Sequence, residues 1–250
     1  MMLQNNTVEK LQEMKLGTMA KSFLEQMDNR AASDLSFEDR FAMLVDDEWT
    51  FRRNNLRDRL KRKANFEFPS ASIEGIDYRE DRNLDKSLIT RLATCRYVDE
   101  HHNIILLGAT GSGKTYLACA FGNKAAHNFY TVRYVRLPEL LTELAMARAE
   151  GKYGKVLRQY RQTKLLILDE WLLYPLKEAE ARDVLEVAES RYQKGSTIFC
   201  SQFDVGGWHQ KIGESTLADA VCDRIVYESY NIVINGKESM RKIKGLKAET

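Results

Sequence analysis

Proline, glycine and paired cysteines are scarce in this sequence, and each scarcity excludes a class of protein. The 250 residues include only 3 prolines and 14 glycines, which argues against a loop-dominated or all-β design. Hydrophobic residues account for 44% of the chain and charged residues for 30%, a balance that excludes wholesale disorder and fibrous structure. The length suits one large domain, or one domain with a small appendage.

Features of disulfide-bonded, zinc-binding and membrane proteins are also missing. The four cysteines lie far apart without a CxxC motif, so we expect buried thiols rather than a disulfide or a zinc site. Apolar runs reach at most six consecutive residues, far fewer than the roughly 18 that a membrane-spanning helix needs. The first residues lack the apolar core of a signal peptide. We therefore expect a cytoplasmic protein without a membrane partner.

Excess charge of one sign is missing overall but present locally. The net charge is only +2, so binding to nucleic acid would need a local patch. Residues 1–51 carry five cations against ten acids, whereas residues 52–63 carry seven cations against Asp58 alone. Cations favour a helix C-terminus, but seven exceed what a helix dipole needs. A solvated helix end remains the alternative to a surface that binds DNA phosphate. The seven cations are Arg52, Arg53, Arg57, Arg59, Lys61, Arg62 and Lys63.

The first 65 residues or so are expected to be helical. They contain one glycine and no proline, and apolar residues recur every three or four positions from Val8 to Met27. Residues 29–35 resemble a turn, and Ser36, three residues before Asp39, is a suitable N-cap for a second, longer helix. Two antiparallel helices are the simplest arrangement.

After a connector at Glu67–Asp81, short apolar runs alternate with amphipathic helices. This alternation predicts a mostly parallel sheet that is covered on both faces. The expected strands are Asn103–Leu107, Val132–Leu137, Leu165–Asp169, Thr197–Ser201 and Tyr230–Ile234. The expected helices are Leu84–Asp99, Lys114–His127, Pro138–Ala149, Lys177–Gln193 and Leu217–Tyr227.

The strongest functional motif follows the first expected strand. It matches GxxxxGK[ST] and lies between a strand and a helix, the context that a phosphate-binding loop requires. Backbone N–H groups would surround a β-phosphate, Lys114 would reach the β- and γ-phosphates, and Thr115 would place its hydroxyl on Mg²⁺. The motif comprises Gly108, Ala109, Thr110, Gly111, Ser112, Gly113, Lys114 and Thr115.

An acidic pair follows the apolar strand LLIL. Because parallel sheets bind ligands beyond the carboxyl ends of their strands, we expect Asp169 and Glu170 to face the phosphate-binding loop. Asp169 suits the Mg²⁺ shell, and Glu170 suits activation of a water molecule. A catalytic glutamate at this position is typical of ATPases that activate water.

Three further polar residues are candidates for the same chemistry. Gln202, at the tip of the Thr197–Ser201 strand, could contact the γ-phosphate or the attacking water, and Ser201 is the competing candidate. Arg224 and Arg241 could stabilise phosphate charge in the transition state, or could form surface ion pairs.

Together these motifs resemble the IstB/DnaC group of AAA+ ATPases. The resemblance rests on GATGSGKT, LLILDE, the strand ending in CSQ, the DRI sequence at Arg224 and GKESMR at Arg241. The segment Leu3–Phe68 is similar to the helical N-terminal domain of IstB proteins, the ATP-dependent helpers of insertion-sequence transposases. The similarity covers nearly the whole chain.

The resemblance implies a fold, cofactors and partners. The fold is an α/β AAA+ P-loop NTPase core at residues 68–250, with a five-stranded parallel sheet between helices, preceded by a small all-α domain at residues 1–67. The cofactors are ATP and Mg²⁺. The partners are duplex DNA bound with little sequence preference, a transposase, and further copies of the chain in an ATP-dependent ring-like or spiral homo-oligomer.

The resemblance also implies residue roles. The strand before Gln202 would lie between the P-loop strand and the Asp169 strand, with Gln202 as the first sensor and Arg241 as the second. Arg224 would be an arginine finger that acts on ATP held by a neighbouring subunit. Only nine residues follow Arg241, so we expect the C-terminal helical lid to be absent or vestigial.

Two alternative functions remain open at this point. A helicase loader of the DnaC kind would share the core but would bind a helicase and single-stranded DNA. A scaffold that binds ATP without turnover would have no need of Glu170 as a water activator.

Overall fold

The computed structural model of the chain describes residues 2–29, 32, 34–213, 215–236, 239, 240 and 242. The chain forms two compact units that divide between Arg59 and Leu60. This division lies inside a helix, before the boundary expected after residue 67. The difference arises because Leu60, Ala64 and Phe66 are buried in the second unit. The Phe66 ring packs so closely on Gly122 that a Cβ atom there would lie 2.5 Å from it.

The described residues of the N-terminal unit form three α-helices where two helices were expected. They are α1 (Met2–Glu13), α2 (Gly17–Asp28) and α3 (Phe37–Ala64), of which α3 continues into the second unit. The first expected helix breaks because Lys15 adopts a left-handed conformation with φ of 60°. The break is stabilised by Glu48 of α3, whose Oε2 accepts hydrogen bonds of 3.0 Å from the Thr18 and Met19 amides of α2.

Ser36 caps α3 as its sequence position predicted. Its hydroxyl accepts a 3.1 Å hydrogen bond from the Asp39 amide and donates a 2.8 Å bond to the Asp39 carboxylate. A hydroxyl at this position satisfies an amide that has no partner within the helix. The Ser36–Asp39 pair therefore fixes where α3 begins.

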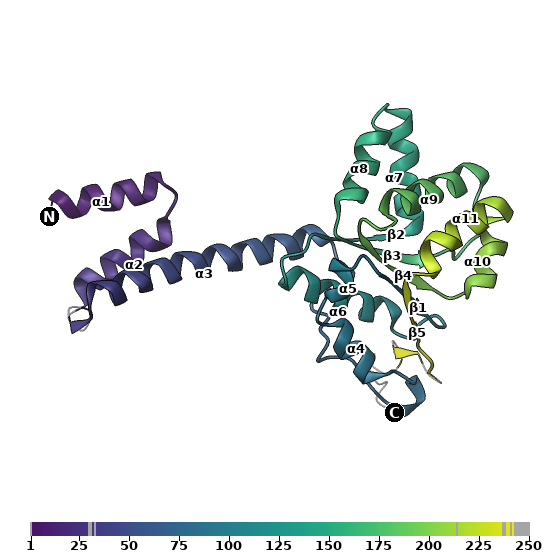
Figure 1. The fold of residues 1–250 in the computed structure, drawn as a ribbon, viewed down its shortest axis with the longest axis horizontal. Helices are drawn as coiled ribbons and strands as arrows, with labels where there is room; N and C mark the ends of the chain where they lie inside the picture. Colours follow the sequence, from purple (N-terminus) through teal and green to yellow (C-terminus); the bar gives the residue numbers. More distant parts are fainter. Residues whose placement is uncertain are drawn as a thin grey trace, which may run out of the picture. The chain divides into compact units, whose positions relative to one another are not determined.

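The second unit is built on a five-stranded parallel sheet with the order β2-β3-β4-β1-β5 (Figure 1). This order places the strand before Gln202 between the P-loop strand and the Asp169 strand, as predicted. The strands are β1 (Asn103–Leu107), β2 (Val132–Arg136), β3 (Leu165–Trp171), β4 (Ser196–Ser201) and β5 (Ser229–Val233). All five lie within two residues of their expected bounds.

Helices cover both faces of this sheet. The helices are η2 (Glu80–Arg82), α4 (Lys86–Leu92), α5 (Arg96–Asp99), α6 (Lys114–His127), α7 (Leu137–Ala149), α8 (Tyr153–Gln162), α9 (Glu178–Arg191), α10 (Val205–Ile212) and α11 (Ser215–Val226). Figure 1 shows α4, α5 and α6 on one side of the sheet and α7 to α11 on the other.

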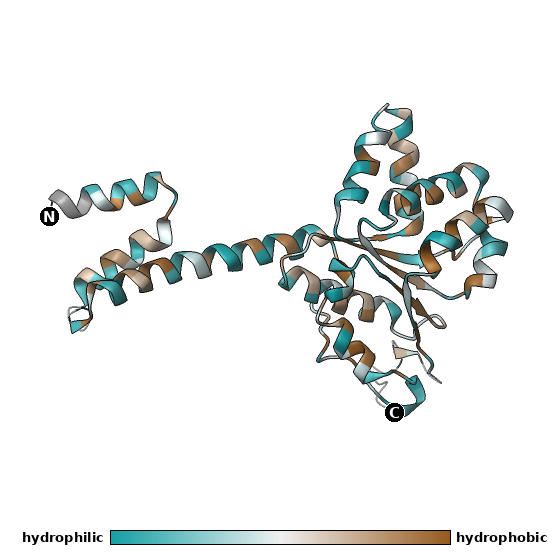
Figure 2. Cartoon of the chain, in the orientation of Figure 1, coloured by the Kyte–Doolittle hydropathy of each residue, from teal (hydrophilic) through white to brown (hydrophobic). Residues whose placement is uncertain are grey.

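Side chains of the apolar strand LLIL point alternately to the two faces of the sheet. They are all buried because helices cover both faces. Leu166 and Leu168 belong to the core formed with α7 to α11. Ile167 points the other way, towards Gly122 of α6. Figure 2 shows the consequence, since the central strands are brown while the outer helix surfaces are largely teal.

After the connector, one expected helix is divided and two helices were not expected. The expected helix Leu84–Asp99 is two helices, because α4 ends at Leu92 and Cys95, with φ of 65°, interrupts the helical backbone before α5 begins. Asp85 caps α4 by accepting hydrogen bonds from the Ser87 and Leu88 amides. Helices α8 and α10 had not been anticipated.

All four cysteines are free and buried, as expected. No described helix combines the length and the apolarity that a membrane span requires.

Candidate nucleotide-binding site

The loop between β1 and α6 has the backbone geometry of a phosphate-binding loop. Gly111 and Gly113 have φ of 79° and 95°, conformations that residues with a Cβ atom rarely adopt. A Cβ atom on Gly113 would also lie 2.9 Å from the Arg82 guanidinium. Lys114 begins α6 directly after the loop. The loop can therefore close tightly in front of a helix N-terminus, where backbone N–H groups favour an anion.

Lys114 is held inside the concave side of this loop. Its Nζ donates hydrogen bonds of 2.6 and 2.9 Å to the carbonyl oxygens of Gly108 and Ala109. Burial lowers the pKa of the ammonium, and the nearby Cys200 and Asp169 oppose that shift. The ammonium is thus fixed beside the loop, where it could contact a phosphate.

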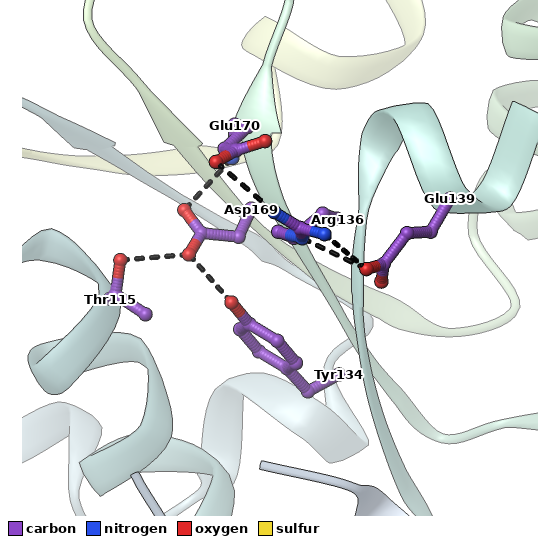
Figure 3. Close-up of polar contacts among 6 residues, drawn as sticks. All are labelled: Thr115, Tyr134, Arg136, Glu139, Asp169 and Glu170. Atoms are coloured by element: carbon purple, nitrogen blue, oxygen red, sulfur yellow. Dashed lines mark hydrogen bonds and ion pairs between the residues drawn. The ribbon is translucent and has the colours of Figure 1, made fainter. Parts of the chain in front are cut away.

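Asp169, at the carboxyl end of β3, accepts three hydrogen bonds. Its Oδ2 accepts from the Thr115 hydroxyl at 2.7 Å and from the Tyr134 hydroxyl at 2.8 Å, and its Oδ1 accepts from the Glu170 amide at 2.8 Å (Figure 3). Burial raises the pKa of Tyr134, and the Asp169 charge adds to the effect. Tyr134 therefore remains a hydrogen-bond donor. A hydroxyl and a carboxylate side by side are oxygen donors of the kind that Mg²⁺ prefers, so these residues fit that ion.

Glu170 has an unusual backbone conformation. Its φ is 54°, and the pairing of β3 with β4 shifts register between Leu168 and Trp171. A bulge of this kind reorients a side chain at the edge of a sheet and occurs often beside active sites. Here the irregularity follows directly after Asp169, and both acidic side chains line one cavity.

Arg136 lies between two carboxylates at the end of β2. Its Nη1 is 3.8 Å from Glu170 Oε1, while Nε and Nη2 donate to Glu139 Oε1 at 2.9 and 2.5 Å (Figure 3). The hydrogen bond to Glu139 raises the pKa of the guanidinium, with Glu170 contributing more weakly. Arg136 was not among the site residues expected from the sequence, because only the pairing of β2 with β3 brings it beside Glu170.

One cavity of about 340 Å³ brings the candidate residues together. Lys114, Thr115, Asp169, Glu170 and Gln202 all line it. Ser201, the competitor of Gln202, is instead buried and engaged in the turn after β4. Its Oγ accepts hydrogen bonds from Trp208 Nε1 at 2.9 Å and from the Phe203 amide at 3.1 Å. The geometry therefore favours Gln202 over Ser201 as the polar group that faces a ligand.

A second cavity of about 370 Å³ adjoins the first and shares Phe68, Gly111, Lys114 and Thr115 with it. It is lined by Gly111, Gly113 and Tyr116 together with the connector residues Phe68 and Asp77. Arg82 also lines this cavity and joins the connector to the loop. Its Nη1 donates to the Asp77 carbonyl at 2.6 Å and its Nη2 to the Ser112 carbonyl at 2.7 Å. Burial lowers the pKa of Arg82. The connector thus forms a wall of the site, a role that its irregular sequence did not indicate.

Comparison with known proteins identifies the family. The model for the IstB-like ATP binding protein family matches residues 9–248. The chain belongs to the IstB-like ATP-binding family. An insertion sequence ATP-binding protein of Sinorhizobium fredii, y4pL, is 39% identical over 245 residues, which cover 96% of this chain and 98% of that protein. The insertion sequence IS21 ATP-binding protein of Pseudomonas aeruginosa is 31% identical over 225 residues, 90% of this chain and 83% of that protein.

The IstB-like chain also shares its fold with a solved helicase loader. The crystal structure of the DnaC helicase loader matches with a TM-score of 0.55 and 17% identity, over 66% of this chain and 97% of that one. This likeness shows the AAA+ fold.

Arg224 of this IstB-like protein lies far from its own P-loop. It is on α11, which leads to the amino end of β5, whereas the P-loop follows the carboxyl end of β1 in the same parallel sheet. Its Nη1 donates to the Ala220 carbonyl at 2.8 Å, and its Nε forms an ion pair with Glu189 of α9. Arg224 lines neither of the two cavities beside the loop. Arg241 lies outside the described residues.

The basic run lies on the C-terminal half of α3, and some of its members have partners within the chain. Arg52 Nε donates to Glu48 Oε1 and Arg52 Nη2 to the Lys15 carbonyl, both at 2.6 Å. The Arg53 guanidinium lies 4.5 Å from the centre of the Trp49 ring, and Arg57 donates to Asn54. The remaining four, Arg59, Lys61, Arg62 and Lys63, form no side-chain hydrogen bond or ion pair with any described residue.

Proposed function

We propose that this protein is a DNA-binding AAA+ ATPase that assists the transposase of an insertion sequence. The relatives to which it is similar over most of their length are insertion sequence ATP-binding proteins. The single observation that carries the ATPase proposal is the convergence of Lys114, Asp169 and Glu170 on one cavity beside the P-loop.

In this proposal the P-loop binds the phosphates of ATP. Backbone amides of Gly111–Lys114 and the N-terminus of α6 bind the β-phosphate, and Lys114 reaches the β- and γ-phosphates. Thr115 and Asp169 hold Mg²⁺, with the Tyr134 hydroxyl keeping the Asp169 carboxylate in place. Bound Mg²⁺ would neutralise charge that develops on the phosphate oxygens.

Glu170 is the group that accepts the proton of the attacking water. Glu170 lines the same cavity as Asp169 but makes no hydrogen bond to Thr115 or Tyr134, which leaves its carboxylate available for a role other than metal binding. Gln202 lines the same cavity from β4 and orients the water or the γ-phosphate. Arg136, in its ion pair with Glu170, restrains the position of the carboxylate.

Arg224 completes the site of a neighbouring subunit. Arg224 precedes the amino end of β5, whereas the P-loop follows the carboxyl end of β1. This separation supports a role for Arg224 at the ATP of another copy of the chain rather than at its own. ATP would then promote self-assembly, because nucleotide and arginine meet only at an interface. The free cations of α3 would contact DNA phosphate.

A DnaC-like helicase loader is the alternative. The likeness to DnaC rests on the fold alone, and the insertion sequence relatives favour a transposase as the partner.

The decisive experiment measures ATP turnover with no DNA, with duplex DNA and with single-stranded DNA. A parallel assay measures DNA strand transfer by the transposase of the same insertion sequence, with and without the protein and ATP. We expect duplex DNA to change ATP turnover and the protein to increase strand transfer only when ATP is present. A preference for single strands together with no effect on the transposase would contradict the proposal and favour the helicase loader.

A further inference from the structure

Helix α8 has a cationic outer face that the ATP site does not use. Its apolar residues Val156, Leu157 and Tyr160 pack into the core on one face of the sheet. Lys155 and Arg158 point away from that core, with Arg161 beside them, because each residue turns the helix by about 100°. All three cations are exposed. Figure 2 shows both teal and brown turns along α8, as expected for an amphipathic helix.

The charge of this face is not neutralised within the described part of the chain. Between Gly151 and Lys164 the sequence contains five basic residues and no acidic residue. Lys155, Arg158 and Arg161 form no side-chain hydrogen bond or ion pair with any described residue. Three positive charges on one helix face are therefore free to attract an external anion.

The acids of the neighbouring helix α7 and its end already have other partners. Glu139 accepts from Arg136, and Glu150 contacts Lys152 at 2.9 Å. Glu143 accepts a 2.6 Å hydrogen bond from Arg133 and a second from the Tyr160 hydroxyl. Each of these carboxylates is therefore already paired with a cation other than Lys155, Arg158 and Arg161.

The chemistry of the face suits phosphate rather than a protein or a bilayer. Residues 151–164 are all described, and none of their large apolar side chains is exposed. Protein interfaces use buried aromatic and aliphatic anchors, and membrane-binding helices insert an apolar face. Phosphate contacts are instead made by Arg, Lys and polar side chains. The exposed Gln159 and Gln162 lie among the three cations and add such groups.

The length of the charged face also fits a nucleic-acid backbone. Lys155 and Arg161 are six residues apart, a distance of about 9 Å along the helix axis. A DNA strand carries one phosphate per about 3.4 Å of its axis, so this length covers two or three phosphates. The three cations could therefore contact successive phosphates of one strand.

We propose that the outer face of α8 is a DNA-binding surface on the ATPase unit, in which Lys155, Arg158 and Arg161 bind phosphates of duplex DNA. The inference rests on the proposed DNA-binding function and adds a contact that is separate from the basic run of α3. Because phosphates carry no sequence information, this contact raises affinity equally for all duplexes.

The test compares two triple variants by duplex binding at several salt concentrations, with a non-hydrolysable ATP analogue present. One variant carries Lys155→Gln, Arg158→Gln and Arg161→Gln. The control carries Lys86→Gln, Arg96→Gln and Lys194→Gln, three exposed cations outside α8, so both lose the same charge. We expect only the α8 variant to flatten the plot of log K against log salt, by ~0.9 for each lost phosphate contact.

Three controls separate the possible outcomes. Circular dichroism and nucleotide binding should be unchanged in the α8 variant, because the three side chains have no internal partners. Sedimentation with the ATP analogue should show unchanged assembly; a loss of assembly would place the cations at a subunit interface and overturn the inference. A salt slope equal to that of the wild type would also overturn it, whereas a wild-type protein that binds no duplex at all would contradict the proposed function itself.

Discussion

The Tyr134 hydroxyl lies 2.8 Å from the Asp169 carboxylate and donates to the same oxygen, Oδ2, as Thr115. Tyr134 comes from β2 and Asp169 from β3, so the hydrogen bond joins two neighbouring strands at the edge where the P-loop lies. Removing Tyr134 is therefore expected to disturb a Mg²⁺ ligand without touching the P-loop.

We expect Tyr134→Phe to raise the Mg²⁺ concentration needed for half-maximal ATP turnover by about 10-fold, since loss of a group that orients a metal ligand weakens metal binding by 10- to 100-fold. Nucleotide binding in the absence of Mg²⁺ should not change. Tyr130→Phe is the matched control, because the Tyr130 hydroxyl donates to Asp99 instead. An unchanged Mg²⁺ dependence in the Tyr134 variant would show that the hydrogen bond is merely structural.

Substitutions of Lys114 and Glu170 should impair different steps of the ATPase reaction. Lys114→Ala should abolish ATP binding or turnover, because it removes the cation that faces the β- and γ-phosphates. Glu170→Gln should keep ATP binding and lose hydrolysis, because an amide cannot accept the proton of the attacking water. Fluorescent nucleotide binding and phosphate release measure the two properties separately. Hydrolysis at the parental rate by Glu170→Gln would disprove the role assigned to this residue.

Much of the fold and part of the site could be predicted from the sequence because the signals are contiguous. The P-loop and the LLILDE strand each combine a strong hydrophobic pattern with polar residues at its end, and the resemblance to a known family placed the strands in order. Tyr134, Arg136 and Arg82 were missed because each is a single residue on another segment, and only tertiary structure brings it to the site. Their sequence neighbourhoods carry no pattern that distinguishes them from ordinary surface or strand residues.

The break between α1 and α2 escaped prediction for a similar reason. The apolar spacing continues through residues 14–16, so periodicity alone indicates one helix. The hydrogen bonds from Thr18 and Met19 to Glu48, and from Arg52 to the Lys15 carbonyl, favour the break. Glu48 lies on α3 and is separated from this point by about 30 residues.

Glu48 provides a prediction about pH. Burial alone would raise its pKa, but the hydrogen bonds from Arg52 and from the Met19 and Thr18 amides outweigh burial and leave the pKa below 4.5. The stabilising effect is therefore fully present above pH 4.5 and is lost as the pH falls through the lowered pKa. Hydrogen exchange of the Thr18 and Met19 amides, followed from pH 7 to pH 3, should show faster opening at the acidic end. In Glu48→Gln the opening should be faster at pH 7 and should lose this acid dependence.

The basic run of α3 should contribute to duplex binding through its free members. Neutralising Arg59, Arg62 and Lys63 should weaken binding to all duplexes and reduce the salt slope by ~0.9 per lost phosphate contact. Arg52 is unsuitable for this test, because its replacement would also remove the hydrogen bonds to Glu48 and to the Lys15 carbonyl. The variant with Lys86, Arg96 and Lys194 neutralised is the control for net charge. An unchanged slope would mean that the run is a solvated helix end.

Arg224 forms an ion pair with Glu189 near the amino end of β5, whereas the P-loop follows the carboxyl end of β1. Arg224→Ala should bind ATP normally, since residues 108–115 are intact, but should lose hydrolysis by a factor of about 10³–10⁵ if the arginine acts on the ATP of a neighbour. Arg182→Ala is the matched control, because Arg182 pairs with Glu178 on the exposed surface of α9.

Mixing experiments then distinguish action between subunits from action within one. Arg224→Ala and Glu170→Gln remove different halves of a shared site, so a mixed assembly contains some interfaces in which both halves are intact. Partial recovery of ATP hydrolysis on mixing, measured at constant total protein, is expected. If the two variants assemble together in sedimentation but recover no activity, Arg224 acts within its own subunit or only supports α11 through Glu189 and the Ala220 carbonyl.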